Sequence, residues 1–66
     1  MIDIKVRSWL NHDGYEVDGR AYRLDQIDEL KEIIGDREIN WIRGKNTFTG
    51  EPVSDKFMQN MKENLK

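Results

Sequence analysis

Five carboxylates between residues 25 and 36 form the densest group of reactive side chains in this chain of 66 residues. They are Asp25, Asp28, Glu29, Glu32 and Asp36, and Lys31 is the only basic residue among them. Spaced in this way on a helix, they form a face that attracts and orients a basic partner. A solvated helix surface is the plainer interpretation of the same pattern, and it stays open.

The chain contains two tryptophans, Trp9 and Trp41, which is a large number for its 66 residues. Tryptophan is the residue type most enriched at the energetic centres of protein interfaces. If either indole is exposed, it forms an apolar patch that calls for a partner. The predicted partner-binding residues are therefore the five carboxylates together with Trp9 and Trp41.

A second set of residues suggests nucleic-acid binding as an alternative. Cations accompany an aromatic ring near the first predicted strand and in a later loop, at Lys5, Arg7, Trp9, Arg43 and Lys45. Surfaces that bind single strands combine stacking rings with basic side chains. The formal net charge of −2 argues weakly against this alternative.

Enzymatic chemistry is not expected. There is no cysteine, and the only imidazole, His12, lies in the turn-forming run Asn-His-Asp-Gly. Ser8 falls on a predicted core face and Ser54 precedes a predicted helix, so neither serine has an obvious base. We expect no catalytic residues, no cofactor and no metal site.

The elements that would position these residues begin with a strand over residues 2–10, where apolar and polar side chains alternate. The pair Asp18-Gly19 predicts a tight turn between strands at 15–17 and 20–24, with one bulged strand as the alternative. Residues 38–43 are β-branched and apolar, which favours a fourth strand.

Two helices are expected. The first covers residues 26–34, capped by Asp25 and ended by Gly35, and the second begins after Ser54. Apolar residues recur along one side of each. The expected core consists of Ile2, Ile4, Val6, Leu10, Val17, Tyr22, Leu24, Ile27, Leu30, Ile33, Ile34, Ile42, Phe57, Met58 and Met61.

The element order β-β-β-α-β-α predicts a single α+β domain over residues 1–66. We expect an antiparallel or mixed sheet of three or four strands, with two helices on one face. The opposite face of that sheet would be bare and would carry Lys5, Arg7 and Trp9.

These features predict a non-enzymatic protein-binding module, a small acidic regulator or inhibitor with a basic or nucleic-acid-binding protein as its partner. The chain resembles the very short, cysteine-free, acidic accessory proteins of phages and mobile elements. That resemblance implies a protein that blocks a host or defence factor. A homodimer that buries a sheet edge or the tryptophan pair is a further alternative. No apolar run approaches the roughly 18 residues of a membrane span, so we expect a cytoplasmic protein without a membrane contact.

Overall fold

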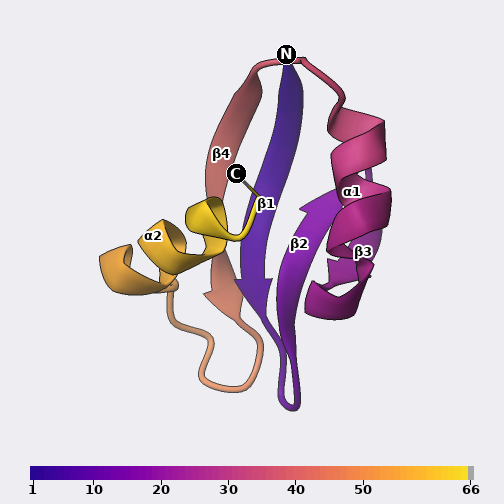
Figure 1. Cartoon of the computed structure of the whole chain (residues 1–66). Helices are drawn as coiled ribbons and strands as arrows, with labels where there is room; N and C mark the ends of the chain where they lie inside the picture. Colours follow the sequence, from indigo (N-terminus) through magenta and orange to yellow (C-terminus); the bar gives the residue numbers. More distant parts are fainter. Residues whose placement is uncertain (66) are drawn as a thin grey trace.

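A four-stranded mixed sheet with two helices on one side makes up the computed structural model, which describes residues 1–65 (Figure 1). The α+β prediction is therefore confirmed. The elements in chain order are β1 (Ile2–Ser8), β2 (Asp13–Val17), β3 (Arg20–Arg23), the 3₁₀ turn η1 (Leu24–Gln26), α1 (Ile27–Ile34), β4 (Ile39–Asn46) and α2 (Asp55–Glu63).

The strands are arranged in the order β3-β2-β1-β4. β2 pairs antiparallel with both β1 and β3, whereas β4 runs parallel to β1, with Ile2 opposite Ile39 and Ile4 opposite Trp41. A parallel neighbour needs a long crossover, and here the β2–β3 hairpin and α1 together supply it. The sheet is mixed because of this one pairing.

The hairpin between β2 and β3 turns at Asp18 and Gly19, as the sequence predicts, so the alternative of one bulged strand is wrong. Both residues have positive φ, 51° and 79° respectively. Positive φ at both central residues is the requirement of the turn that best matches strand twist. Asp and Gly are the residue types that meet this requirement at low cost.

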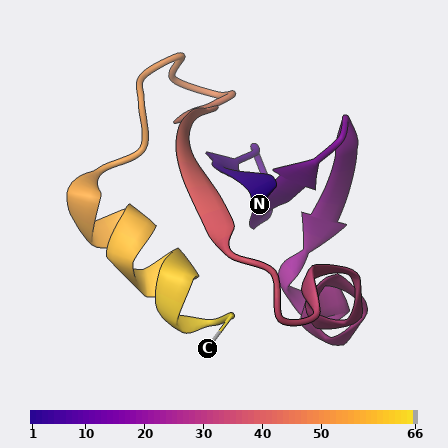
Figure 2. The same ribbon diagram turned by 90° about the horizontal axis from the view of Figure 1, so that it is seen from above.

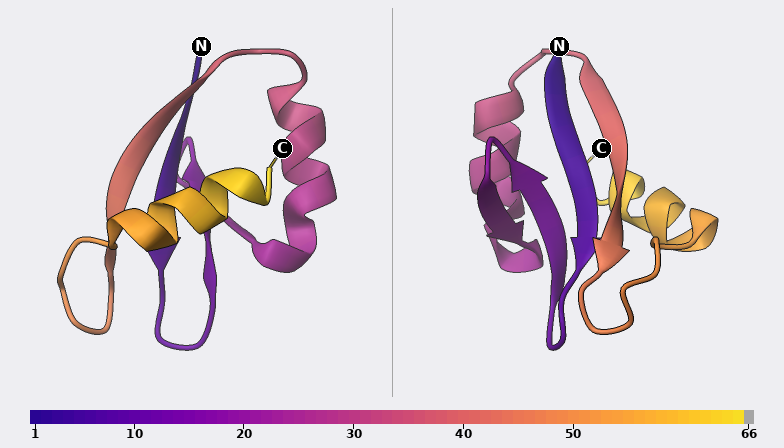
Figure 3. Two further views of the ribbon diagram at one scale, coloured as in Figure 1. Left: turned by 60° about the vertical axis from the view of Figure 1, so that its left-hand side comes forward. Right: turned by 180° about the vertical axis from the view of Figure 1, so that it is seen from behind.

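Both helices lie against the same face of the sheet. Figure 2 shows them at opposite ends of the curved sheet, α1 next to β3 and α2 next to β4. α2 crosses in front of the strands in the left view of Figure 3, and from behind the strands lie in front. The buried apolar core between the layers consists of Ile2, Ile4, Val6, Tyr15, Val17, Tyr22, Leu30, Ile34, Val53, Met58 and Met61.

The two helices begin differently. Ser54 caps α2 as predicted, because its hydroxyl accepts from the Phe57 amide at 3.1 Å. The prediction that Asp25 caps α1 is wrong: the chain enters α1 through η1, and the Gln26 side chain accepts from the Arg23 amide at 3.0 Å. Gly35 ends α1 with φ of 58°, and its amide donates to the Lys31 carbonyl.

Three predicted core residues are exposed instead. Leu10 is 73 % exposed beyond the end of β1, Leu24 is 42 % exposed in η1, and Ile33 is 40 % exposed on α1. Tyr15 and Val53 are buried core residues that the predicted set omits. Each error concerns a position whose burial depends on a distant element rather than on its own periodicity.

Ile42, also predicted for the core, lies on the other face of the sheet, opposite Lys5 of β1, and is partly buried there. Within residues 1–65, neither helix has the length and apolar character needed to cross a membrane.

Candidate functional site

The five carboxylates at residues 25–36 are all exposed on η1, on α1 and just beyond α1. α1 turns Leu30 and Ile34 into the core, so its other sides face solvent. We call this surface the acidic face and define it by Asp25, Asp28, Glu29, Glu32 and Asp36. Every carboxylate that the sequence predicts for this face is exposed.

The nearest arginine does not neutralise the acidic face. The Arg37 side chain folds back onto the end of α1, where Nη2 donates to the Ile33 carbonyl and Nε donates to the Ile34 carbonyl at 3.3 Å. These bonds satisfy carbonyls that have no partner inside the helix. Within residues 1–65 the ion pairs are Arg7–Glu16 and Arg43–Asp55, and neither involves the acidic face.

An apolar side chain borders the acidic face. Ile33 is 40 % exposed and lies one helical turn after Glu29, so the two side chains are neighbours on the surface of α1. Interfaces combine an apolar centre with a charged rim. Its spacing fits the buried stripe of the helix, so the sequence predicts a core position here and gives no sign of exposure.

Trp41 lies on the helix-covered face of the sheet. It is opposite Ile4, which is fully buried, and its ring packs against the core with the Tyr15 ring 6.3 Å away, centroid to centroid. Trp41 is therefore partly buried.

Trp9 lies on the bare face of the sheet, where three groups hold its indole. The Arg7 guanidinium is 5.0 Å from the ring centroid, and the His12 ring stacks on the indole at 4.8 Å with planes 16° apart. A Cβ added at Gly14 would lie 3.2 Å from the indole, so the ring also sits over a strand that carries no side chain there. Trp9 and Trp41 thus lie on opposite faces of the sheet.

Lys5, Arg7, Arg43 and Lys45, predicted for nucleic-acid contact, come together around one hollow of about 260 Å³. Gly44 completes its lining. We call this feature the cationic hollow. β1 and β4 provide all of its residues, and the parallel pairing of these strands brings them together.

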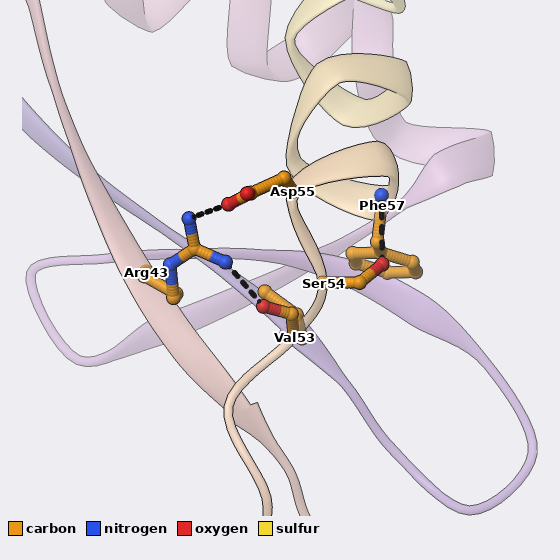
Figure 4. A network of polar contacts seen from close by, with 5 residues as sticks. All are labelled: Arg43, Val53, Ser54, Asp55 and Phe57. Atoms are coloured by element: carbon orange, nitrogen blue, oxygen red, sulfur yellow. Dashed lines mark hydrogen bonds and ion pairs between the residues drawn. The ribbon is translucent and has the colours of Figure 1, made fainter.

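Arg43 also has a structural role. Its Nη1 donates to the Val53 carbonyl at 2.6 Å and its Nη2 to the Asp55 carboxylate, next to the Ser54 cap of α2 (Figure 4). These contacts connect β4 to the start of α2. Arg43 is opposite the fully buried Val6, so its side chain lies on the helix-covered side of the sheet and its guanidinium is engaged at the start of α2.

The residues considered for catalysis have structural partners. The buried Ser8 hydroxyl donates to the Asp13 carboxylate at 2.7 Å, Ser54 caps α2, and His12 stacks on Trp9. Within residues 1–65 there is no group of three or more His, Asp or Glu side chains arranged to hold a metal ion.

The comparisons with known proteins add no relative, since no family model, no curated protein and no solved structure matches this chain.

Proposed function

We propose that this chain is a non-enzymatic protein-binding module that uses its acidic face to dock on a basic surface of another protein. The observation that carries the proposal is five exposed carboxylates on one short helix and its flanks, with the adjacent Arg37 engaged by helix carbonyls. Such a surface, negative apart from Lys31, speeds encounter with an oppositely charged partner and disfavours wrong partners.

A stabilising effect on the helix explains only some of these five negative charges. Asp25, Asp28 and Glu29 lie in first helical turns, where negative charge favours the positive end of the helix dipole. Glu32 and Asp36 lie near the other end, where the dipole disfavours them. Asp28 and Glu32 are also four residues apart in α1, a like-charge spacing that costs about 0.2–0.5 kcal/mol. Charge that opposes local stability supports a role in binding.

The kind of protein proposed is a small regulator or inhibitor, comparable with phage and mobile-element accessory proteins that block a host or defence factor. The partner would be a basic protein, including one whose own groove binds nucleic acid. A cytoplasmic location belongs to the proposal, and the absence of cysteine is compatible with a reducing compartment. Ile33 would add an apolar contact beside the charges.

The experiment is partner capture with two charge-matched variants. The double variant Asp28→Lys/Glu32→Lys reverses the acidic face, while Glu51→Lys/Glu63→Lys makes the same charge change at exposed sites on the β4–α2 loop and on α2. Captured proteins are identified by mass spectrometry, and the purified partner is then titrated at low and high salt. Far-UV circular dichroism checks that both variants are folded.

We expect the acidic-face variant to lose the partner and the control to retain it, with affinity falling as salt rises, because exposed charges are screened. Equal capture by both variants would show that the contact lies elsewhere. Sedimentation of the free chain at micromolar concentration tests the homodimer alternative, which a monomer would contradict.

A further inference from the structure

The cationic hollow on the bare face of the sheet is a second candidate binding site, separate from the acidic face. Four of its five lining residues are cations: Lys5 and Arg7 from β1, and Arg43 and Lys45 from β4. Its volume of about 260 Å³ lies just below the range of about 300–1,000 Å³ for small-molecule sites, so it could hold one anionic group of a larger ligand. A hollow lined in this way favours an anionic group.

The backbone shapes the floor of this hollow. A Cβ added at Gly44 would lie 2.3 Å from the Val6 carbonyl oxygen, 2.7 Å from Cγ of Arg7 and 3.0 Å from Cγ of Lys5. β4 therefore passes close to β1 at Gly44. No side chain of β4 lies there between the aliphatic parts of Lys5 and Arg7. The strand pairing also shifts here: β1 advances two residues from Val6 to Ser8, while β4 advances three, from Arg43 to Asn46. Such a bulge redirects the side chains around it.

The four cations differ in how firmly they are held. Arg7 is ion-paired with Glu16 on the bare face. Arg43 is opposite the buried Val6, and its guanidinium is bound to Val53 and Asp55 at the start of α2, so it borders the hollow without directing its charge into it. Lys5 and Lys45 have no hydrogen-bond or ion-pair partner for their side chains within residues 1–65. The charges of both arginines are matched by carboxylates, so the two unengaged lysines are the groups suited to neutralising phosphates.

An aromatic column continues from the hollow along the same face. Arg7 lines the hollow and also lies over Trp9, on which His12 stacks. Guanidinium planes and imidazole rings are surfaces on which unpaired bases stack. The acidic face lies on the far side of the sheet, on α1, and so does not line this surface.

We propose that the cationic hollow and the Arg7–Trp9–His12 column bind single-stranded nucleic acid. The hollow holds backbone phosphates, and an adjacent base extends the column by stacking. A combination of basic groove and stacking ring is the usual means of binding single strands without sequence preference. This site goes beyond the proposed protein contact, since it lies on the opposite face and uses other residues.

The test is fluorescence anisotropy with a labelled oligothymidylate of about ten nucleotides, a length within the range of known single-strand sites. The variant Lys5→Gln/Lys45→Gln removes the two unengaged cations of the hollow. Lys56→Gln/Lys62→Gln removes two lysines of α2 and is the matched control. Inorganic phosphate, a phosphoserine peptide and a duplex of the same length are titrated in parallel.

We expect the hollow variant to bind the oligonucleotide about tenfold more weakly and to lower the log–log salt slope by about 1.4, since each single-strand phosphate contact contributes about 0.7. The control variant should bind as the unaltered chain does. The indole N–H resonance of Trp9 should shift on titration, while that of Trp41, on the other face, stays in place.

Failure to bind oligothymidylate at low salt would overturn the proposal, as would equal losses in the two variants. Tighter binding of the phosphoserine peptide or of the duplex would also overturn it, because the occupant would then belong to another class. Binding that inorganic phosphate reproduces without any change at Trp9 would remove the stacking part and with it the assignment to nucleic acid.

Discussion

The phenolic hydroxyl of Tyr15 on β2 donates to the backbone carbonyl of Met61 in α2, with 2.5 Å between the oxygens. The two residues are 46 positions apart, so this single bond joins the first hairpin to the last helix. The Tyr15 ring is fully buried. It thereby fixes where α2 crosses the sheet.

Removing this hydroxyl with Tyr15→Phe should lower the free energy of unfolding by about 1–2 kcal/mol, because the Met61 carbonyl loses its donor in a buried site. Denaturant unfolding measures the change. Tyr22→Phe is the control, since Tyr22 is also buried but its hydroxyl has no hydrogen bond within residues 1–65. Equal losses in the two variants would contradict the role given to the Met61 bond.

Stability should also fall at high pH through Tyr15. Burial raises the pKa of Tyr15 from 10.0 to about 12. Below pH 10 Tyr15 is neutral in both the folded and the unfolded chain, so its contribution to the free energy of unfolding is fully present. Between pH 10 and pH 12 the unfolded chain releases the phenolic proton while the folded chain keeps it, and this contribution is lost. The loss should approach about 3 kcal/mol, since each pKa unit corresponds to about 1.36 kcal/mol. Unfolding free energies measured from pH 9 upward should therefore fall more steeply than in Tyr15→Phe; parallel curves would contradict this cause.

Gly44→Ala should destabilise the fold more than Gly50→Ala. At Gly44 the new methyl group meets the Val6 carbonyl at 2.3 Å, a backbone atom that cannot move aside cheaply. At Gly50 there is open space, and the cost is only the positive φ of 76°, about 1–2 kcal/mol. Thermal unfolding ranks the two variants. A Gly44→Ala protein as stable as Gly50→Ala would mean that β1 and β4 are not so close.

At Glu32 of the acidic face, we expect one substitution to change partner affinity and helix stability in opposite directions. Glu32→Gln removes a charge that the helix dipole disfavours, so the free energy of unfolding should rise by about 0.3 kcal/mol while partner affinity falls. Glu29→Gln, in the first turn of α1, should lose both stability and affinity. Chemical denaturation and partner titration measure the two effects. A Glu32→Gln protein with unchanged affinity would exclude this residue from the contact.

Local chemistry was readable from the sequence, whereas distant pairing was not. The Asp18-Gly19 turn and the Ser54 cap depend on neighbouring atoms, and both predictions are confirmed. The face on which Trp41 lies depends on its pairing with Ile4, 37 positions earlier, which no periodicity reveals. Ile33 fits the helical stripe in sequence, yet it is 40 % exposed, because the sheet covers only part of that stripe.

The same distinction applies to the candidate sites. Exposure of the carboxylates followed from the amphipathic pattern of one helix, so the acidic face was predictable as a unit. The cationic hollow required the parallel pairing of β1 with β4 and the close approach at Gly44. A lone glycine in a strand was the available signal, since such glycines often mark bulges or close backbone contacts.

Amide resonance mapping can show whether the acidic face makes the protein contact. The ¹⁵N-labelled chain is titrated with the captured partner, and the shifted amides are placed on the structure. We expect shifts concentrated between Asp25 and Asp36, with the amides of β1 around Lys5 unchanged. Shifts confined to the bare face of the sheet, with α1 unaffected, would contradict it.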